Sequence, residues 1–330
     1  MSKLQKIDVF NFKLENEKRI PFLNLTYQTF GQPLGTAPIV VVNHALTGNS
    51  NVAGEKGWWK ALIGDGKTID TQHFTIVAFN IIGNGFEGGS LIENYTDFTT
   101  RDIAKLFWEG LEYLGIKNVF ALIGGSLGGG IVWEMAFLKP KAMQYVIPIA
   151  SNYKANDWLI ANVKIQDDIL NHSSQPIEDA RKHAMMLYRS PLSIDLKFQQ
   201  EYVNGAYAVE NWLDFHGQSL QTRFSLSAYK LMNHLLRTIG KSVDEMALQL
   251  FFNETTAVIH QVAIDSDGLF VAYENENFHR RFCKQYKALF LHTLNSVHGH
   301  DAFLIEYEQL GQILWPIFNF KTTKNVSYQS

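Results

Sequence analysis

A single serine stands among glycines in the segment VFALIGGSLGGG, which covers residues 119–130. Gly124, Ser126 and Gly128 form a GxSxG pattern that follows an apolar run and precedes a segment of helical length. In the strand-to-helix turn called a nucleophile elbow, small residues two positions either side of the serine avoid collisions with the neighbouring strand and helix. The pattern predicts a strained turn that exposes the Ser126 hydroxyl as a nucleophile.

Two phosphate-binding motifs compete with this interpretation. A P-loop has the pattern GxxxxGK[ST], and the glycines here are not followed by the lysine that it requires. Gly83, Gly85 and Gly88 spell GxGxxG after another apolar run, as a dinucleotide-binding loop would. The following SLIENYTDFTT lacks the apolar period of the required helix, so residues 84–98 are predicted to form a flexible loop. Nucleophilic catalysis is therefore favoured over nucleotide binding.

A serine hydroxyl is a weak nucleophile until a base takes its proton, so the pattern requires a base and an acid that orients it. In nucleophile-elbow enzymes the three residues follow in the order serine, acid, histidine, with the last two on loops after late strands. The loops after the apolar segments 257–265 and 287–294 offer two acids and two bases: Asp265, Asp267, His298 and His300. We favour Asp267 and His300, partly on a family resemblance.

The oxyanion of such a reaction is held by two backbone N–H groups. One belongs to the residue after the nucleophile, Leu127. The second comes from a loop after an early strand, and the loop NHALTGNS follows the apolar run PIVVVN, which makes Leu46 the candidate. His44 in the same loop is interpreted as a residue that stabilises the loop.

The elements that must position these residues alternate between strand and helix. Residues 6–12 and 23–30 alternate apolar and polar side chains and predict an antiparallel hairpin. Short, nearly continuous apolar runs predict buried parallel strands at 38–43, 74–80, 119–124, 145–150, 257–265 and 287–294. Apolar side chains recur at helical spacing in residues 102–116, 127–140 and 302–318, which predicts three helices. The pattern predicts a mainly parallel α/β sheet flanked by helices.

The strand signal disappears between residues 152 and 250, where the pattern becomes helical. We predict an inserted helical cap, or lid, at 152–250. The α/β core is then assembled from residues 1–151 and 251–320, and the polar residues 321–330 are predicted to form a flexible tail.

Composition excludes several classes of function. The chain has 330 residues, 46% of them hydrophobic, and a formal charge of −3 without basic clusters, so nucleic acid is not an expected partner. One cysteine, Cys283, cannot form an internal disulfide or a multi-thiolate metal site, and no other metal-ligand spacing is present. Without a signal peptide or a membrane-length apolar segment, a cytoplasmic protein with no membrane association is expected.

Several segments together resemble the homoserine O-acetyltransferase family of the α/β-hydrolase fold. They are, in the order of that family, LNLTYQTFG, VVNHALTG, GWWKALIGDGKTIDT, TTRDIAK, LIGGSLGG, ARKHAMMLYRS, ENWLDFHGQSLQTRF, IDSDGLF and HGHDAFLIE. The resemblance implies Ser126 as nucleophile, Asp267 as acid and His300 as base. It also implies that Arg181 and Asp301, with Tyr188 close by, hold the carboxylate and amino groups of homoserine.

The implied reaction moves an acetyl group from acetyl-CoA to the hydroxyl of L-homoserine, a step of methionine biosynthesis. Acetyl-CoA is a co-substrate, no resident cofactor is expected, and the resemblance implies a homodimer. A serine hydrolase (esterase or thioesterase) with the same triad, a transferase acting on serine and a transferase using succinyl-CoA remain open alternatives. The stretch 84–98 and the cap entry between 150 and 180 are shorter than usual in the family.

Overall fold

The computed structural model describes residues 3–319 and is built around an eight-stranded sheet with the order β1-β2-β6-β3-β7-β8-β11-β12. These strands are β1 (Gln5–Lys13), β2 (Arg19–Gly31), β3 (Ile39–Asn43), β6 (Thr75–Phe79), β7 (Val119–Gly125), β8 (Met143–Ile149), β11 (Val258–Ile264) and β12 (Leu289–Leu294). The pairs β1–β2 and β2–β6 are antiparallel and the remaining pairs are parallel. The hairpin and the mainly parallel sheet are confirmed. The predicted tail 321–330 lies outside the described residues.

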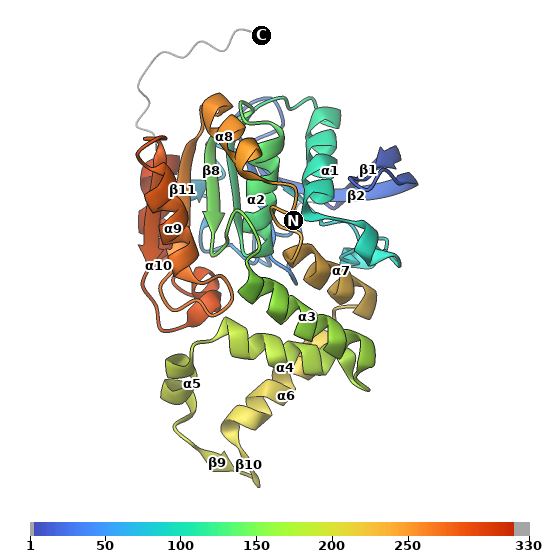
Figure 1. Cartoon of the computed structure of the whole chain (residues 1–330), viewed down its shortest axis with the longest axis vertical. Helices are drawn as coiled ribbons and strands as arrows, with labels where there is room; N and C mark the ends of the chain where they lie inside the picture. The colour runs from blue at the N-terminus through green and yellow to red at the C-terminus, as the bar shows by residue number, and fades with distance from the viewer. Residues whose placement is uncertain (1–2, 320–330) are drawn as a thin grey trace.

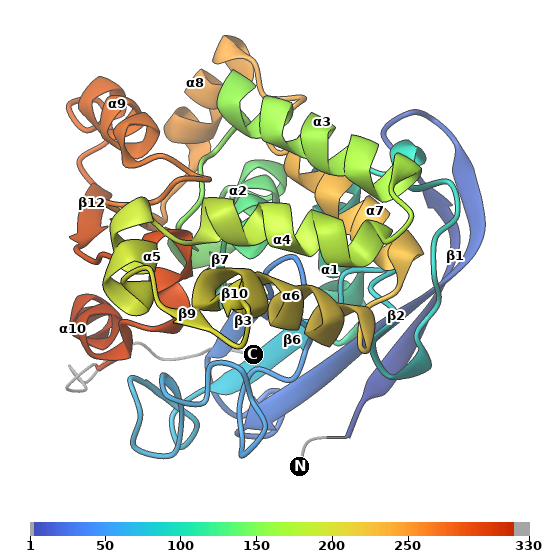
Figure 2. The same ribbon diagram turned by 90° about the horizontal axis from the view of Figure 1, so that it is seen from below.

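Helices cover both faces of the sheet, which explains why its central strands are apolar throughout. In β3, Val41 packs with helices α1 (Thr100–Tyr113) and α2 (Leu127–Leu138), while its neighbours Val40 and Val42 pack on the opposite face. Figure 2 shows α9 (Ala272–Phe282) and α10 (Tyr307–Phe318) on opposite sides of β12. The last helix begins at Tyr307, later than predicted, because the preceding Gly299–Leu304 forms a short 3-10 helix, η3.

A helical layer between β8 and β11 lies beyond the carboxyl ends of the parallel strands (Figure 1). Its elements are α3 (Asp157–His172), α4 (Pro176–Tyr188), α5 (Pro191–Phe198), β9 (Tyr202–Val203), β10 (Ala206–Tyr207), α6 (Ala208–Gln221) and α7 (Leu226–Leu236). Helix α4 contacts α3, α6 and α7, and the β9–β10 hairpin forms the far tip. Ligands of α/β sheets bind at the carboxyl ends of the strands, so this layer stands over the expected site.

Helix α8 (Glu245–Glu254) lies apart from this layer, at the opposite end of the molecule in Figure 1. Its Phe251 packs against Phe137 and Trp133 of α2, with ring centroids 4.9 and 6.4 Å apart. The predicted cap range 152–250 thus ends inside a helix that packs on α2 of the core. None of the helices within residues 3–319 is both long and apolar enough to cross a bilayer.

The remaining short elements connect the sheet strands. Strands β4 (Ile63–Gly64) and β5 (Ile69–Asp70) pair with each other outside the main sheet. The GxGxxG stretch leads into two 3-10 turns, η1 (Phe86–Gly88) and η2 (Tyr95–Asp97), and not into the α-helix that a dinucleotide site requires. The rejection of the dinucleotide-binding loop agrees with this geometry.

Candidate active site

Ser126 occupies the turn between β7 and α2, with φ 58° and ψ −125°. A positive φ at a residue with a side chain costs about 1–3 kcal/mol, and this strained turn is the mark of a nucleophile elbow. A Cβ atom on Gly124 would lie 2.6 Å from the backbone of Gly128, and one on Gly128 would lie 2.3 Å from the carbonyl oxygen of Asn43. Both positions therefore require glycine, as the GxSxG pattern predicts.

Gly128→Ala is expected to lower the free energy of unfolding by about 3 kcal/mol or to prevent folding, because two backbone segments would have to separate. Urea unfolding followed by circular dichroism measures the effect. Gly311→Ala is the matched control, because the nearest atom to its added Cβ is the movable Thr68 hydroxyl at 3.2 Å. A Gly128→Ala protein with the wild-type unfolding midpoint would contradict the tight elbow.

The catalytic triad predicted from the sequence is assembled in the structure. His300 Nε2 lies 2.8 Å from Ser126 Oγ, and its Nδ1 lies 2.7 Å from Asp267 Oδ2. The three side chains are buried, and Asp267 Oδ1 accepts hydrogen bonds of 2.8 Å from the N–H groups of Leu269 and Phe270. A carboxylate fixed in this way favours the proton on Nδ1, which leaves Nε2 free to accept the serine proton.

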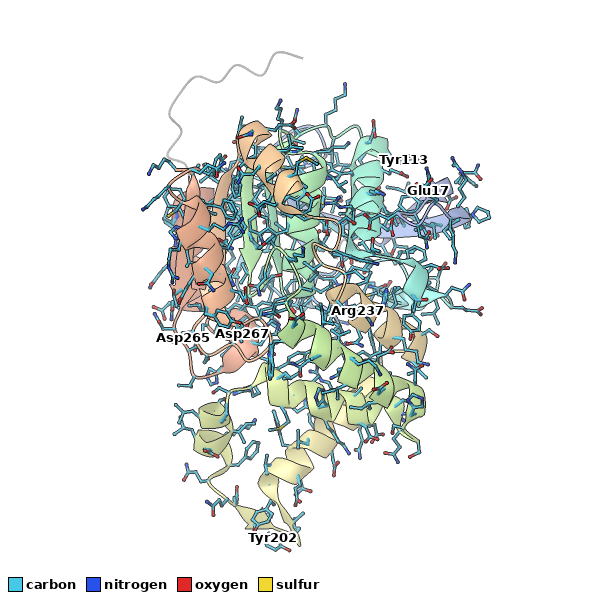
Figure 3. All side chains as sticks on the ribbon, viewed as in Figure 1. Glu17, Tyr113, Tyr202, Arg237, Asp265 and Asp267 are labelled. Carbon is cyan, nitrogen blue, oxygen red and sulfur yellow. The ribbon has the colours of Figure 1, made fainter. Side chains whose placement is uncertain are left out.

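The two rival residues point elsewhere. His298 Nδ1 lies 2.9 Å from the guanidinium of Arg189, on the cap side of the loop. Asp265 accepts a 3.0 Å hydrogen bond from the N–H of Ser296 and joins the two late loops. Figure 3 labels Asp265 and Asp267 where the core meets the cap. Of the two candidate bases, His300 is the one bonded to Ser126, and of the two candidate acids, Asp267 is the one bonded to His300.

The environment of His300 controls its protonation. Burial by itself lowers the pKa of this imidazole, but the charge and hydrogen bond of Asp267 and the charge of Asp301 outweigh burial and raise the pKa above its ordinary value. Three aromatic rings have centroids 5.5–5.6 Å from the imidazole: Tyr188, Phe270 and Phe303. The two phenylalanines were missed by the sequence analysis, although each stands three residues after a triad member.

The pH dependence of Ser126 acylation follows from this shift. Only neutral His300 accepts the serine proton, so the rate of the reaction with p-nitrophenyl acetate is expected to fall as the pH drops through a pKa above about 6.5. Asp301→Asn removes a negative charge that raises the pKa of His300, so this limb should move to lower pH. Stopped-flow rates as a function of pH, measured for the wild type and for Asp301→Asn, give the acidic limb of each protein. An acidic limb of Asp301→Asn with the same apparent pKa as that of the wild type would contradict the assigned electrostatics.

The two predicted oxyanion donors lie at the same edge of the sheet. Leu127 is the first residue of α2, where helical N–H groups have no partner within the helix. Leu46 lies in the loop after β3, and β3 pairs with β7 so that Asn43 stands opposite Gly124. The loop that carries Leu46 therefore begins beside the turn that carries the nucleophile.

His44 stabilises the loop after β3 and takes no part in the triad. Its Nδ1–H donates to the carbonyl oxygen of Ala45 at 2.7 Å, and its Nε2 accepts from the N–H of Ile81 at 3.0 Å. Burial lowers the pKa of His44 to about 4, so the ring stays neutral and keeps both bonds. The interpretation as a loop-stabilising histidine fits this geometry.

Arg181, Tyr188 and Asp301 gather on the cap side of the triad. The Arg181 guanidinium lies 5.3 Å from the ring centroid of Tyr188, and that ring lies 5.5 Å from the ring of His300. Burial raises the pKa of Asp301, while the charges of His300, Arg181 and Arg189 act in the opposite direction. Neither Arg181 nor Asp301 has an ion pair within 4.0 Å in the described part of the chain. Both side chains are thus without an ion-pair partner among residues 3–319.

Comparisons with known proteins identify the family of the chain. A family model described as the alpha/beta hydrolase fold matches residues 38–298. A homoserine O-acetyltransferase of Trichormus variabilis is 31% identical, over 94% of this chain and 91% of its own. The crystal structure of homoserine O-acetyltransferase from Bacillus anthracis has a TM-score of 0.86 at 18% identity, over 98% of this chain and 100% of its own. The crystal structure of esterase E22 has a TM-score of 0.85 at 16% identity, over 97% of this chain and 100% of its own. At such identities the two structures establish the fold alone.

Proposed function

Because the chain belongs to the homoserine O-acetyltransferase family within the α/β-hydrolase fold, and is an acyltransferase, we propose that it transfers an acetyl group from acetyl-CoA to the hydroxyl of L-homoserine. This reaction is a step of methionine biosynthesis. The observation that carries the acceptor is the pair of opposite charges, Arg181 and Asp301, beside the triad. A free amino acid is a zwitterion and offers one partner to each.

The first half-reaction acylates the enzyme. His300 Nε2 takes the proton of Ser126 as Oγ attacks the thioester carbonyl carbon, and the N–H groups of Leu46 and Leu127 hold the oxyanion. The tetrahedral intermediate then collapses. The C–S bond breaks, and the CoA sulfur leaves with the proton that His300 carried. An acetyl ester on Ser126 remains.

The second half-reaction transfers the acetyl group to the acceptor. The carboxylate of homoserine pairs with Arg181, and its ammonium group pairs with Asp301 beside the Tyr188 hydroxyl. His300 takes the proton of the acceptor hydroxyl, whose oxygen attacks the acyl-serine carbonyl. The bond between the acyl carbon and Ser126 Oγ then breaks, and Oγ leaves with the proton that His300 carried, which restores the enzyme. Transfer exceeds hydrolysis because the bound alcohol has a high effective concentration under a cap that limits water.

Arg181→Ala is expected to raise the KM for L-homoserine by about 10- to 100-fold, the effect of losing charge-assisted hydrogen bonds of roughly 1.5–3 kcal/mol. The acylation rate with acetyl-CoA should change little. Steady-state kinetics with both substrates varied separates the two effects. Lys182→Ala on the same helix is the control, because Lys182 pairs with Asp214 at 2.6 Å. An unchanged homoserine KM in Arg181→Ala would remove the basis of the acceptor assignment.

A panel of acceptors and donors tests the substrates directly. The proposal predicts O-acetylhomoserine from acetyl-CoA and L-homoserine, with much slower reaction of L-serine. Turnover of acetyl-CoA that is indifferent to both amino acids would instead identify a hydrolase. A homodimer belongs to the same proposal, and light scattering of the purified chain tests it.

A further inference from the structure

The loop that carries the triad acid is held from the cap side by a tryptophan. The indole N–H of Trp158, in the first turn of α3, donates a 2.8 Å hydrogen bond to the carbonyl oxygen of Gly268, the residue after Asp267. The same peptide unit carries the N–H of Leu269, which donates a 2.8 Å hydrogen bond to Asp267 Oδ1. One peptide plane therefore connects the cap to the catalytic carboxylate.

This peptide unit stands at the start of a chain of hydrogen bonds that ends at the nucleophile. Asp267 Oδ2 lies 2.7 Å from His300 Nδ1, and His300 Nε2 lies 2.8 Å from Ser126 Oγ. A peptide whose carbonyl accepts a hydrogen bond is polarised, so its N–H becomes a better donor. Because the peptide is planar, a bond that fixes the carbonyl also fixes the direction of the N–H. The Trp158 indole thus strengthens and directs a bond to the triad acid.

The first turn of α3 is anchored to the core. Asn156 Oδ1 accepts a 2.9 Å hydrogen bond from the N–H of Leu159 and so caps the helix. The amide group of Asn156 also donates to Glu274 Oε1 at 3.2 Å, and Glu274 belongs to α9, which directly follows the acid loop. Trp158 is therefore presented to the acid loop from a fixed support.

The cap encloses the same peptide from a second side. A Cβ atom on Gly268 would lie 3.2 Å from the carbonyl oxygen of Leu187, near the end of α4. The Leu269 side chain is buried and forms part of the wall of a small cavity, together with residues of α3, α4 and α7. The conformation of the acid loop therefore depends on the seating of the cap.

We propose that Trp158 is a positioning residue for Asp267, and that it couples the seating of the cap to the assembly of the triad. The indole N–H exerts this effect through the peptide between Gly268 and Leu269. The side chain of Trp158 is 50% exposed, so its ring contributes little to the packing of the core. The proposal rests on the proposed acylation of Ser126 and is independent of the identity of donor and acceptor.

Trp158→Phe tests the proposal, because it removes the indole N–H and keeps an aromatic ring. The rate of p-nitrophenol release in the first turnover with p-nitrophenyl acetate should fall about three- to tenfold, the effect of one neutral hydrogen bond. The second measurement concerns the proton on His300 Nδ1, which is identified by a low-field proton NMR signal that Asp267→Asn lacks. This proton should exchange faster with water in Trp158→Phe.

Trp108→Phe is the matched control, because the Trp108 indole also donates to a backbone carbonyl, that of Met135 at 2.9 Å, but joins α1 to α2. This variant should lose stability and keep the wild-type rate and proton signal. A Trp158→Phe protein with the wild-type rate and signal would overturn the proposal. Equal losses of rate in the two variants would also overturn it, since any lost indole bond would then have the same effect.

A double-mutant cycle separates an action through Asp267 from a general loosening of the site. In the Asp267→Asn background, Trp158→Phe should change the slow rate less than about twofold, because His300 Nε2 then carries the proton whatever the position of the acid loop. The full loss of about three- to tenfold in this background would place the action of Trp158 elsewhere and overturn its assignment. A wild-type protein that p-nitrophenyl acetate does not acylate would overturn the proposed acylation of Ser126, and this inference with it.

Discussion

Alanine in place of Ser126 is expected to lower the rate of acyl transfer by about 10⁴- to 10⁶-fold. The acyl group has no other attachment point in the proposed mechanism, because the only oxygen within 2.8 Å of His300 Nε2 among residues 3–319 is Ser126 Oγ. The proposed oxyanion donors and the charges of Arg181 and Asp301 stay in place in this variant. Any residual rate measures their contribution alone.

Intact-protein mass spectrometry after mixing with acetyl-CoA measures the acetyl ester directly. Wild type should gain one acetyl group, and Ser126→Ala should gain none. Ser151→Ala is the control, since Ser151 is another buried serine, just after the end of β8, whose hydroxyl does not meet the imidazole. An acetylated Ser126→Ala protein, or wild-type turnover in that variant, would remove Ser126 from the mechanism.

Asp267→Asn is expected to lower kcat by about 10⁴-fold while leaving the fold intact. The carbonyl oxygen of the new amide can keep the hydrogen bonds from the N–H groups of Leu269 and Phe270. Its NH₂ group then faces His300 Nδ1, which must act as an acceptor. The imidazole proton moves to Nε2, and that nitrogen can no longer take the proton of Ser126.

Asp265→Asn provides the comparison within the same loop. Asp265 accepts one hydrogen bond from Ser296 and does not touch His300, so this variant should keep kcat within about twofold. Both variants are measured with acetyl-CoA and L-homoserine, and circular dichroism checks the fold. Equal losses of activity in the two variants would mean that the loop as a whole, and not the Asp267 carboxylate, supports catalysis.

The sheet could be predicted from the sequence because its strands carry a direct physical signal. Strands such as β3 and β6 are covered on both faces, so each consists of consecutive apolar residues, while β1 and β2 alternate. The predicted start of the last helix was less accurate. The apolar residues Ala302 and Phe303 continue the helical period but belong to η3, where they are buried below the catalytic loop.

Without the family resemblance, the residue pattern predicts the acid and the base of the triad only as a short list of candidates. The order of the loops reduced the acid and the base to two residues each, but residues two positions apart on one loop have the same surroundings in the sequence. The hydrogen bonds of His300 to Ser126 and Asp267, and those from Leu269 and Phe270 to Asp267, decide between them, and these depend on the folded loops.

The cap is the part that the sequence described least. Its helices contribute Val163, Ala184 and Leu236 to a small cavity between α3, α4 and α7, and each is an ordinary apolar residue of an amphipathic helix. Nothing in the helical period separates a side chain that packs on a neighbour from one that lines a cavity. The position of α8 was missed for the same reason, since Phe251 could pack equally well within a cap or against the sheet helices.

The most direct test of the account is free-thiol release from acetyl-CoA by the wild-type chain, measured with and without L-homoserine and with analysis of the product. The account predicts that L-homoserine accelerates thiol release beyond the first turnover and that O-acetylhomoserine accumulates in equal amount. Steady thiol release that is indifferent to L-homoserine, with acetate as the product, would contradict it.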